Sequence, residues 1–184
     1  MTNATIIMNA EEIKKALDKL ADEILNAVKE PEKLALIGIR TRGVHIAMRL
    51  KAILDEKLKH KNGQELPFGK LDINLYRDDF HQKRNQPVIG ITDIPFDVTD
   101  KIILLCDDVM FTGRTTRAAL DAIIDFGRPK SVKAVALIDR GLREYPIQPD
   151  FVSKKVETSD KETVKVRLVE TDGEDKVILT DDQD

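Results

Sequence analysis

One stretch in the middle of the chain restricts the possible folds more than any other. Residues 103–116 read ILLCDDVMFTGRTT: an apolar run, two carboxylates, and a turn that contains hydroxyl groups and one glycine. The apolar run before Asp107 and Asp108 predicts a buried strand with two acidic side chains at its end. Thr112 and Gly113 then predict a tight turn into a helix. A strand, turn and helix in this order is typical of an α/β fold that binds a ligand at the carboxyl end of the strand.

The residue types in this stretch suit a sugar phosphate. Adjacent carboxylates at Asp107 and Asp108 repel each other unless a cation or donor hydroxyls lie between them, and a ribose diol or a bound Mg²⁺ supplies either. Taken alone, the pair is equally compatible with a solvated acidic turn. Residues 112–116 place free amides and threonine hydroxyls at a helix start, which suits a phosphate monoester, although a plain threonine cap explains them too. Arg114 is either a phosphate ligand or a surface residue.

The remainder of the chain predicts helices alternating with strands. Asn9 and Glu12 form the ends of a capping-box pattern before a helix, and Gly127 with Pro129 ends a later one. Strands are predicted at 34–39, 70–76, 101–106, 132–138 and 164–169, and helices after residue 9, from about residue 44 to residue 60, and at 114–126. The pattern predicts one α/β domain over residues 1–184 with a mainly parallel sheet flanked by helices. A protruding flap at 76–98 and an acidic tail at 170–184 are expected as well.

Composition restricts the partners and the compartment. The net charge is −3, so a polyanion must be held by a local basic patch and not by overall charge. Cys106 is the single cysteine, which fits a reducing cytoplasm. No apolar stretch approaches the roughly 20 residues that span a bilayer, and the first residues lack the features of a signal peptide. We therefore expect a cytoplasmic protein without a membrane partner.

The acidic stretch resembles the phosphoribosyl-pyrophosphate (PRPP) signature of type I phosphoribosyltransferases. That signature is an apolar strand, an acidic pair, a few variable residues and then T-G-[RK]-T. The resemblance implies that Asp107 and Asp108 hold the ribose diol, with Mg²⁺ bound alongside PRPP. It also implies that residues Val109, Met110, Phe111, Thr112, Gly113, Arg114 and Thr115 surround the nucleotide and its 5′-phosphate.

A second segment matches the same family at the expected place upstream. Residues 38–43 read GIRTRG after an apolar strand, and in such enzymes this turn holds pyrophosphate and often contains a strained peptide bond. The resemblance implies pyrophosphate binding by Arg40, Thr41, Arg42 and Gly43. It further implies that Arg77, at the base of the flap, closes over the pyrophosphate as a catalytic residue, and that Arg140 faces it.

The resemblance narrows to the bifunctional pyrimidine-operon attenuation and uracil phosphoribosyltransferase family. The matching segments are 71–79, 97–101, 127–129 and 139–147, within a match from about residue 9 to residue 169. Two positions depart from the family pattern, because Leu142 stands where histidine is frequent and Phe111 where tyrosine is frequent. Purine-specific relatives carry aspartate at the position of Phe111, so this chain is expected to prefer uracil.

The family resemblance implies two activities. One is the conversion of uracil and PRPP to UMP and pyrophosphate, and the other is the binding of a pyrimidine-operon leader mRNA hairpin when UMP or UTP is present, which terminates transcription. A homodimer or a higher homo-oligomer is expected. Two alternatives remain open: a nucleotide-sensing RNA-binding regulator with little catalysis, and a salvage phosphoribosyltransferase for another base.

Overall fold

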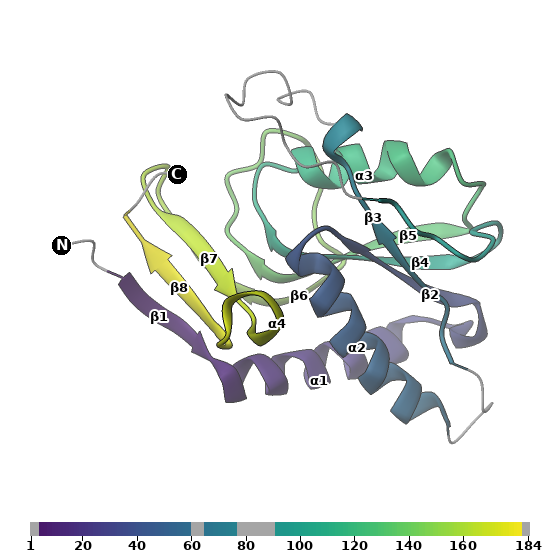
Figure 1. Ribbon diagram of the computed structural model, residues 1–184, viewed down its shortest axis with the longest axis horizontal. Helices are drawn as coiled ribbons and strands as arrows, with labels where there is room; N and C mark the ends of the chain where they lie inside the picture. The colour runs from purple at the N-terminus through teal and green to yellow at the C-terminus, as the bar shows by residue number, and fades with distance from the viewer. Residues whose placement is uncertain (1–3, 60–64, 77–90, 182–184) are drawn as a thin grey trace.

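A five-stranded sheet forms the centre of the protein. The computed structural model describes residues 4–59, 65–76 and 91–181. The sheet contains β2 (Leu34–Ile39), β3 (Phe68–Leu71), β4 (Ile102–Met110), β5 (Ser131–Asp139) and β6 (Phe151–Lys155). Its order is β3-β2-β4-β5-β6 and every neighbouring pair is parallel (Figure 1). The predicted fold class, a mainly parallel sheet with helices around it, is confirmed.

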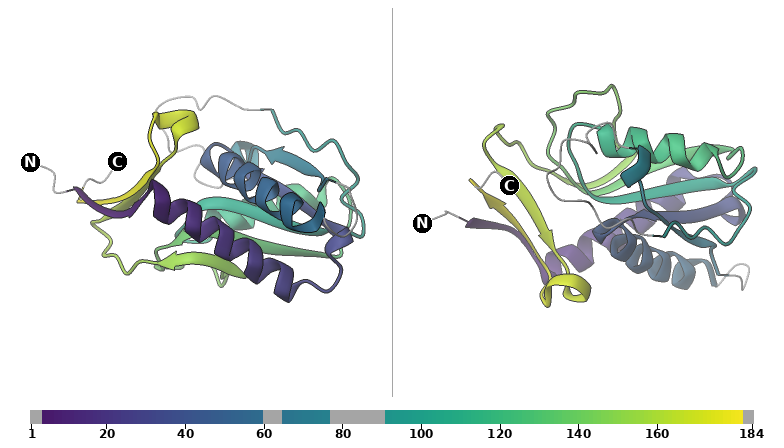
Figure 2. Two further views of the ribbon diagram at one scale, coloured as in Figure 1. Left: turned by 90° about the horizontal axis from the view of Figure 1, so that it is seen from below. Right: turned by 45° about the horizontal axis from the view of Figure 1, so that its top comes forward.

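Helices cover both faces of this sheet. Two of them, α1 (Ala10–Ala27) and α2 (Arg42–Lys59), lie on one face, and α3 (Arg114–Ile124) lies on the other (Figure 2). Alternate residues of β2 serve the two faces: Leu34 and Leu36 belong to the core under α1 and α2, whereas Ala35 and Ile37 belong to the core under α3. A strand buried on both faces needs apolar residues at every position, which is why β2 has no polar alternation.

Local sequence signals determine where the first helix begins. The Glu12 amide donates to Asn9 Oδ1 at 3.0 Å, and the Asn9 amide donates to Glu12 Oε2 at 2.8 Å. This reciprocal pair is the predicted capping box, and it satisfies amides that have no partner within the helix.

A smaller antiparallel sheet stands beside the large one. It consists of β1 (Ala4–Asn9), β8 (Lys176–Thr180) and β7 (Thr163–Arg167), in the order β1-β8-β7, with the short helix α4 (Val169–Asp172) between β7 and β8. We call these four elements the hood, and Figure 1 shows it on the left with both chain ends. The predicted late edge strand is β7, and the acidic tail supplies β8, which is the middle strand.

Some sequence predictions need correction. The predicted strand at 70–76 is wrong beyond Leu71, because Asp72 Oδ1 accepts the Asn74 amide at 2.8 Å and this Asx turn leads into the 3-10 helix η2 (Asn74–Tyr76). Strands β1 and β6 were not predicted. Most of the predicted flap, residues 77–90, lies outside the described residues. The described end of the flap is joined to β3 by an antiparallel bridge between Asp93 and Lys70.

Two further features of the described residues concern membrane-spanning helices and the single cysteine. Over residues 4–59, 65–76 and 91–181, no helix combines the length and the apolar character needed to cross a membrane. Cys106 is a free, fully buried thiol in β4.

Candidate functional site

Two predicted segments meet at the carboxyl edge of the parallel sheet. The turn after β2 and the end of β4 are neighbours because β2 pairs with β4. Together they line a hollow of about 290 Å³. The lining residues are Ile39, Arg40, Thr41, Arg42, Ile73, Asn74, Asp107, Asp108, Val109 and Thr115. The structure therefore brings the basic turn and the acidic pair to one place.

The acidic pair lies within β4 and not after its end. Pairing with β5 continues as far as Met110 and Asp139, so the strand is longer than its apolar run predicts. Asp107 Oδ1 accepts the Asp108 amide at 2.9 Å, and Asp108 Oδ1 accepts the Val109 amide at 2.9 Å. These bonds fix the orientation of both carboxylates at the rim of the hollow.

The basic turn packs directly on the strand that carries the acidic pair. A Cβ atom added at Gly43 would lie 2.6 Å from the Cys106 carbonyl oxygen and 3.1 Å from Asp107 Cα. Only glycine permits this approach of two backbone segments. The peptide bond between Arg40 and Thr41 is cis.

The two arginines of this turn have different partners. Arg40 donates from Nε and Nη2 to the Ile91 carbonyl at 3.1 and 2.8 Å. Arg42 reaches the hood, where its Nε and Nη2 donate to the two carboxylate oxygens of Asp172 at 3.1 and 2.8 Å. Hydrogen bonding by Arg42 holds the pKa of Asp172 well below its usual range. Arg42 is thus shared between the site and the hood.

The turn between β4 and α3 is braced by the loop after β5. Gly113 has φ 90° and precedes α3, whose first residue is Arg114. The amides of Glu144 and Tyr145 donate to the Thr112 carbonyl at 2.9 and 3.0 Å. Hydrogen bonds from the loop after β5 therefore hold the turn. The first amides of α3, which have no acceptor within the helix, follow directly after it.

Arg114 is directed toward the same loop. Its Nε donates to Glu144 Oε2 at 2.7 Å, and its guanidinium lies 5.3 Å from the centre of the Tyr145 ring. Arg114 was expected to be either a phosphate ligand or a surface residue. These contacts join its side chain to Glu144 and Tyr145, the two residues whose amides brace the turn.

Arg140 is buried behind Phe111. Its guanidinium lies 4.0 Å from the centre of the Phe111 ring, and only 7% of the residue is exposed. It donates to Thr158 Oγ1 at 3.1 Å and to the Glu162 carbonyl at 2.6 Å, and burial lowers its pKa. The described contacts of the Arg140 guanidinium go to Phe111 and to the segment that leads to β7.

Asp139, Arg143 and Asp172 contact the site but were not among the predicted site residues. Arg143 donates from Nη2 to Asp139 Oδ1 at 2.6 Å and from Nη1 to the Phe111 carbonyl at 2.5 Å, so it fixes the backbone next to the turn. The four-residue spacing of Asp139 and Arg143 predicts no contact from the sequence, because Asp139 ends β5 and Arg143 lies in the loop after it and not in a helix. Asp172 gives no signal either, because it lies in a different part of the chain from Arg42. Arg77 lies outside the described residues.

A second hollow, of about 400 Å³, lies on the hood side of Arg42. Arg42 and Asp108 line it together with Asp172 and residues 163–167 of the hood. The two hollows therefore share Arg42 and Asp108 as a common wall.

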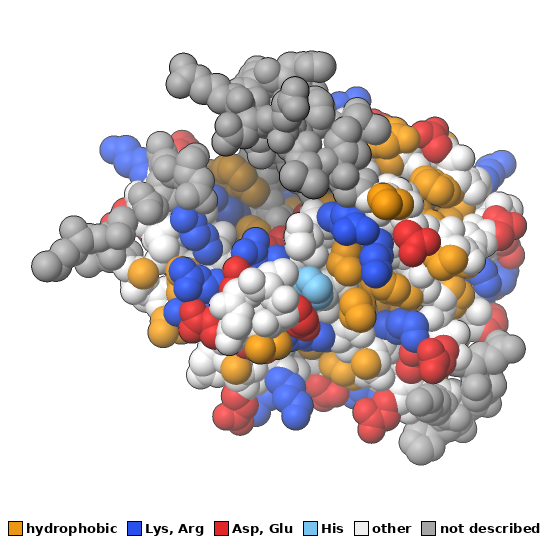
Figure 3. All heavy atoms as spheres, viewed as in Figure 1, with side chains coloured by type: hydrophobic (Ala, Val, Ile, Leu, Met, Phe, Trp, Pro, Cys, Tyr) orange, Lys and Arg blue, Asp and Glu red, His pale blue; other side chains and the backbone are white. Residues whose placement is uncertain are grey.

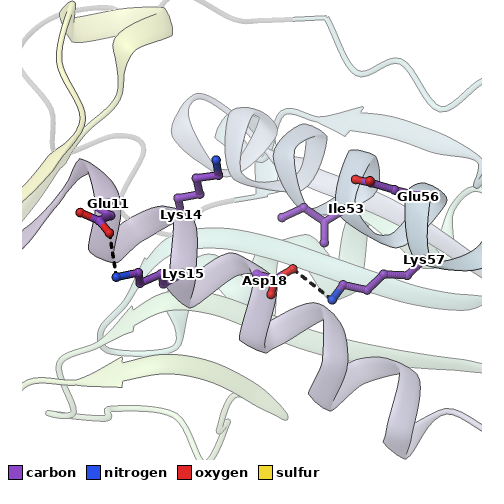
Figure 4. A pocket seen from close by; sticks show the side chains of 7 residues that line it. All are labelled: Glu11, Lys14, Lys15, Asp18, Ile53, Glu56 and Lys57. Carbon is purple, nitrogen blue, oxygen red and sulfur yellow. Dashed lines mark ion pairs between the residues drawn. The ribbon is translucent and has the colours of Figure 1, made fainter.

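A larger hollow, of about 620 Å³, lies between α1 and α2 and contains none of the predicted site residues (Figure 4). Four of its charged groups form two ion pairs, Lys15 with Glu11 at 2.7 Å and Lys57 with Asp18 at 3.0 Å. Size alone therefore does not identify the site.

Comparisons with known proteins identify relatives over nearly the whole chain. The family model "Phosphoribosyl transferase domain" matches residues 3–171. The Bifunctional protein PyrR of Deinococcus radiodurans is 49% identical over 178 residues, which cover 97% of this chain and 95% of the relative. The protein of the same name from Thermus aquaticus is 51% identical over 173 residues, covering 94% of this chain and 93% of the relative.

A solved structure shows the same fold at much lower identity. The hypoxanthine phosphoribosyltransferase of Trypanosoma cruzi superposes with a TM-score of 0.71 at 17% identity, covering 98% of this chain and 97% of that one. At this identity the likeness extends to the fold alone.

Proposed function

The chain belongs to the phosphoribosyl transferase family and, within it, to the bifunctional PyrR proteins, and on this premise we propose that it has two activities. It converts uracil and PRPP to UMP and pyrophosphate, and it binds pyrimidine-operon leader RNA when UMP or UTP is bound. Residues 1–184 act as a single phosphoribosyltransferase domain. The observation that carries the enzymatic half is the hollow at which Arg40, Arg42, Asp107 and Asp108 meet.

The reaction requires stabilisation of opposite charges at two ends of one bond. Displacement at the anomeric carbon builds positive charge on the ribose and negative charge on the departing pyrophosphate. Asp107 and Asp108 accept the ribose hydroxyls and lie near the developing cation, while Arg40 and Arg42 receive the pyrophosphate. Fixed charges of this kind, in place before the reaction, are the main source of catalysis in such a mechanism.

The remaining predicted residues hold the ends of the substrate. Backbone amides and hydroxyls of residues 112–115, at the start of α3, bind the 5′-phosphate, because a helix start presents donors and a partial positive charge. Amides of Thr41 and Gly43 add donors for the pyrophosphate. Arg77 closes over it and excludes water. Val109 and Met110 support the nucleotide from the end of β4.

Asp107 and Asp108 are the residues that would hold Mg²⁺ together with PRPP. Among the described residues no group of three or more His, Cys, Asp or Glu side chains is placed to hold a metal ion. Mg²⁺ is usually bound by one or two carboxylates together with waters and substrate phosphates, and Asp107 with Asp108 fits that donor set. When bound, the ion neutralises charge on the pyrophosphate.

Phe111 is proposed as the residue that favours uracil over purines. Its ring is backed by Arg140, and its carbonyl accepts from Arg143, so it is fixed on two sides. It offers no ionisable group to a purine ring nitrogen. Arg140 contributes to nucleotide binding by supporting Phe111.

RNA binding depends on surface cations that are spread among acids. Lys and Arg side chains alternate with Asp and Glu over the face shown in Figure 3. Lys154 lies on β6, which packs next to α1, where Lys14 and Lys19 lie. The basic charge on one such face is small. A homodimer or larger homo-oligomer brings two faces together on one RNA.

Two assays on the purified protein test the proposal. Formation of UMP from uracil is measured with PRPP and Mg²⁺, with hypoxanthine and guanine as competing bases. A gel shift with the leader RNA hairpin is run with and without UMP. RNA binding without turnover selects a regulator with a sensory nucleotide site. Turnover of a purine base but not of uracil selects a salvage enzyme and contradicts both halves.

A further inference from the structure

The contact between Arg42 and Asp172 joins the predicted pyrophosphate turn to the hood. Both carboxylate oxygens of Asp172 accept from the guanidinium, at 3.1 Å from Nε and 2.8 Å from Nη2. This two-point geometry restricts rotation of the guanidinium as well as its distance, which a single contact does not achieve.

Asp172 is itself held in place by its own helix. The Leu168 amide donates to Asp172 Oδ2 at 3.0 Å, and Thr171 Oγ1 donates to the same oxygen at 2.6 Å. Hydrogen bonding by Arg42, and then by Thr171 and the Leu168 amide, lowers the pKa of Asp172, so the carboxylate is ionised at neutral pH. The acceptor for Arg42 is therefore held by donors from its own segment and is charged at neutral pH.

The position of Asp172 relative to the two hollows decides its role. Arg42 lines both hollows, whereas Asp172 is part of the lining on the hood side only. Asp172 thus holds the guanidinium from the side away from Asp107 and Thr115, which line the hollow assigned to the pyrophosphate and the ribose.

We propose that Asp172 is a positioning residue that orients Arg42 toward the pyrophosphate, so that the hood completes the PRPP site. The inference rests on the proposed function, since it takes Arg42 as a PRPP ligand. A long arginine side chain loses rotamer freedom when it binds an anion, and the contact with Asp172 removes that loss from the binding step. The hood then contributes to the affinity for PRPP through Asp172, although no hood residue contacts PRPP in this proposal.

The structure offers a matched control in the same segment. Arg49 of α2 donates to Asp175 at 2.7 and 2.8 Å and to Glu170 at 2.8 and 2.6 Å. These pairs attach the α4 segment to α2, yet none of their side chains lines either hollow at the site. An Asp175→Asn change loosens the hood while leaving the Arg42 contact intact.

The test compares PRPP binding by calorimetry, in the presence of Mg²⁺, for full-length variants. Asp172→Asn is expected to raise the dissociation constant for PRPP about tenfold, which corresponds to about 1.4 kcal/mol, while Asp175→Asn changes it less than about twofold. Arg42→Ala combined with Asp172→Asn is expected to bind no more weakly than Arg42→Ala alone, because Asp172 acts only through Arg42.

Other results overturn the inference. Equal weakening by Asp172→Asn and Asp175→Asn means that general attachment of the hood matters and not the orientation of Arg42. Additive losses in the double variant mean that Asp172 acts independently of Arg42. If Asp172→Asn does not fold, Thr171→Ala, at an exposed position, carries the test. It is expected to raise the dissociation constant about two- to threefold, and an unchanged constant refutes the proposal.

Binding and turnover separate this inference from the proposed function. A wild-type protein that binds PRPP but forms no UMP contradicts the enzymatic proposal, while the ranking of the variants still decides the role of Asp172. A wild-type protein that turns over uracil, with Asp172→Asn unchanged in PRPP affinity, supports the enzyme and removes the positioning role.

Discussion

Replacing Gly43 by alanine tests whether the basic turn and the acidic pair must touch. In most helices this substitution is stabilising, by about 0.5–1 kcal/mol, because alanine loses less backbone entropy on folding. At Gly43 the new methyl group would lie 2.6 Å from the Cys106 carbonyl oxygen, roughly 0.8 Å short of the 3.4 Å at which ordinary contact begins. The atoms that it meets belong to the backbone of a central strand, so no rotamer change relieves the overlap.

The expected effect follows from these two opposing terms. Overpacking of this kind costs about 1–3 kcal/mol, which exceeds the gain in helix propensity. We therefore expect Gly43→Ala to lower the free energy of unfolding by about 1–2 kcal/mol and the melting temperature by about 2–8 °C. The separation of the basic turn from Asp107 should also weaken PRPP binding at least about tenfold.

Thermal unfolding and PRPP titration together provide the measurement. Ala52→Gly is a suitable control, because Ala52 is an exposed position further along α2. It is expected to cost about 1 kcal/mol through helix propensity alone and to leave PRPP affinity unchanged. A Gly43→Ala protein as stable as wild type, with unchanged PRPP affinity, would refute the argument that direct backbone contact builds the site.

Three further predictions concern carboxylates of the site and the buried thiol. Replacing Asp107 and Asp108 together by asparagine should reduce UMP formation at least about 100-fold without unfolding the protein; retained activity would remove their assignment to the ribose diol. Because Arg42 lowers the pKa of Asp172 in the folded state, the unfolded state binds that proton more tightly, and the free energy of unfolding should fall as the pH drops below about 3.9. Urea unfolding between pH 5 and 3 should show a shallower decline of this free energy in Asp172→Asn than in wild type. Burial raises the pKa of the Cys106 thiol, so iodoacetamide should label it far more slowly in native than in unfolded protein, and equal rates by mass spectrometry would contradict the described burial.

Features encoded by neighbouring residues could be predicted from the sequence. The capping box of Asn9 and Glu12 needs three residues of spacing and nothing else, and the structure confirms it. The strand, turn and helix around Gly113 are also local, because glycine at a positive φ starts the helix there. The parallel sheet followed from the alternation of such units along the chain.

Features that depend on distant partners could not be predicted in this way. Strand β4 extends past its apolar run because β5 pairs with it through Asp139, and no property of Asp107 announces that partner. Strand β1 forms through its pairing with β8, at the opposite end of the chain. The contact of Arg42 with Asp172 is of the same kind, since each residue alone is an ordinary charged side chain.

The pairing of β1 with β8 has a consequence for the order of folding. Ala4 pairs with Thr180, so the hood closes a loop that contains the whole parallel sheet. Contacts between residues so far apart in the chain form late, after local helices and neighbouring strands. During synthesis on the ribosome, β1 must wait without its partner until β8 emerges, while the five-stranded sheet can already assemble. A nascent chain would thus carry the acidic pair of β4 before α4 and Asp172 have emerged to meet Arg42, and under the positioning role proposed for Asp172 its affinity for PRPP would rise only after that contact forms.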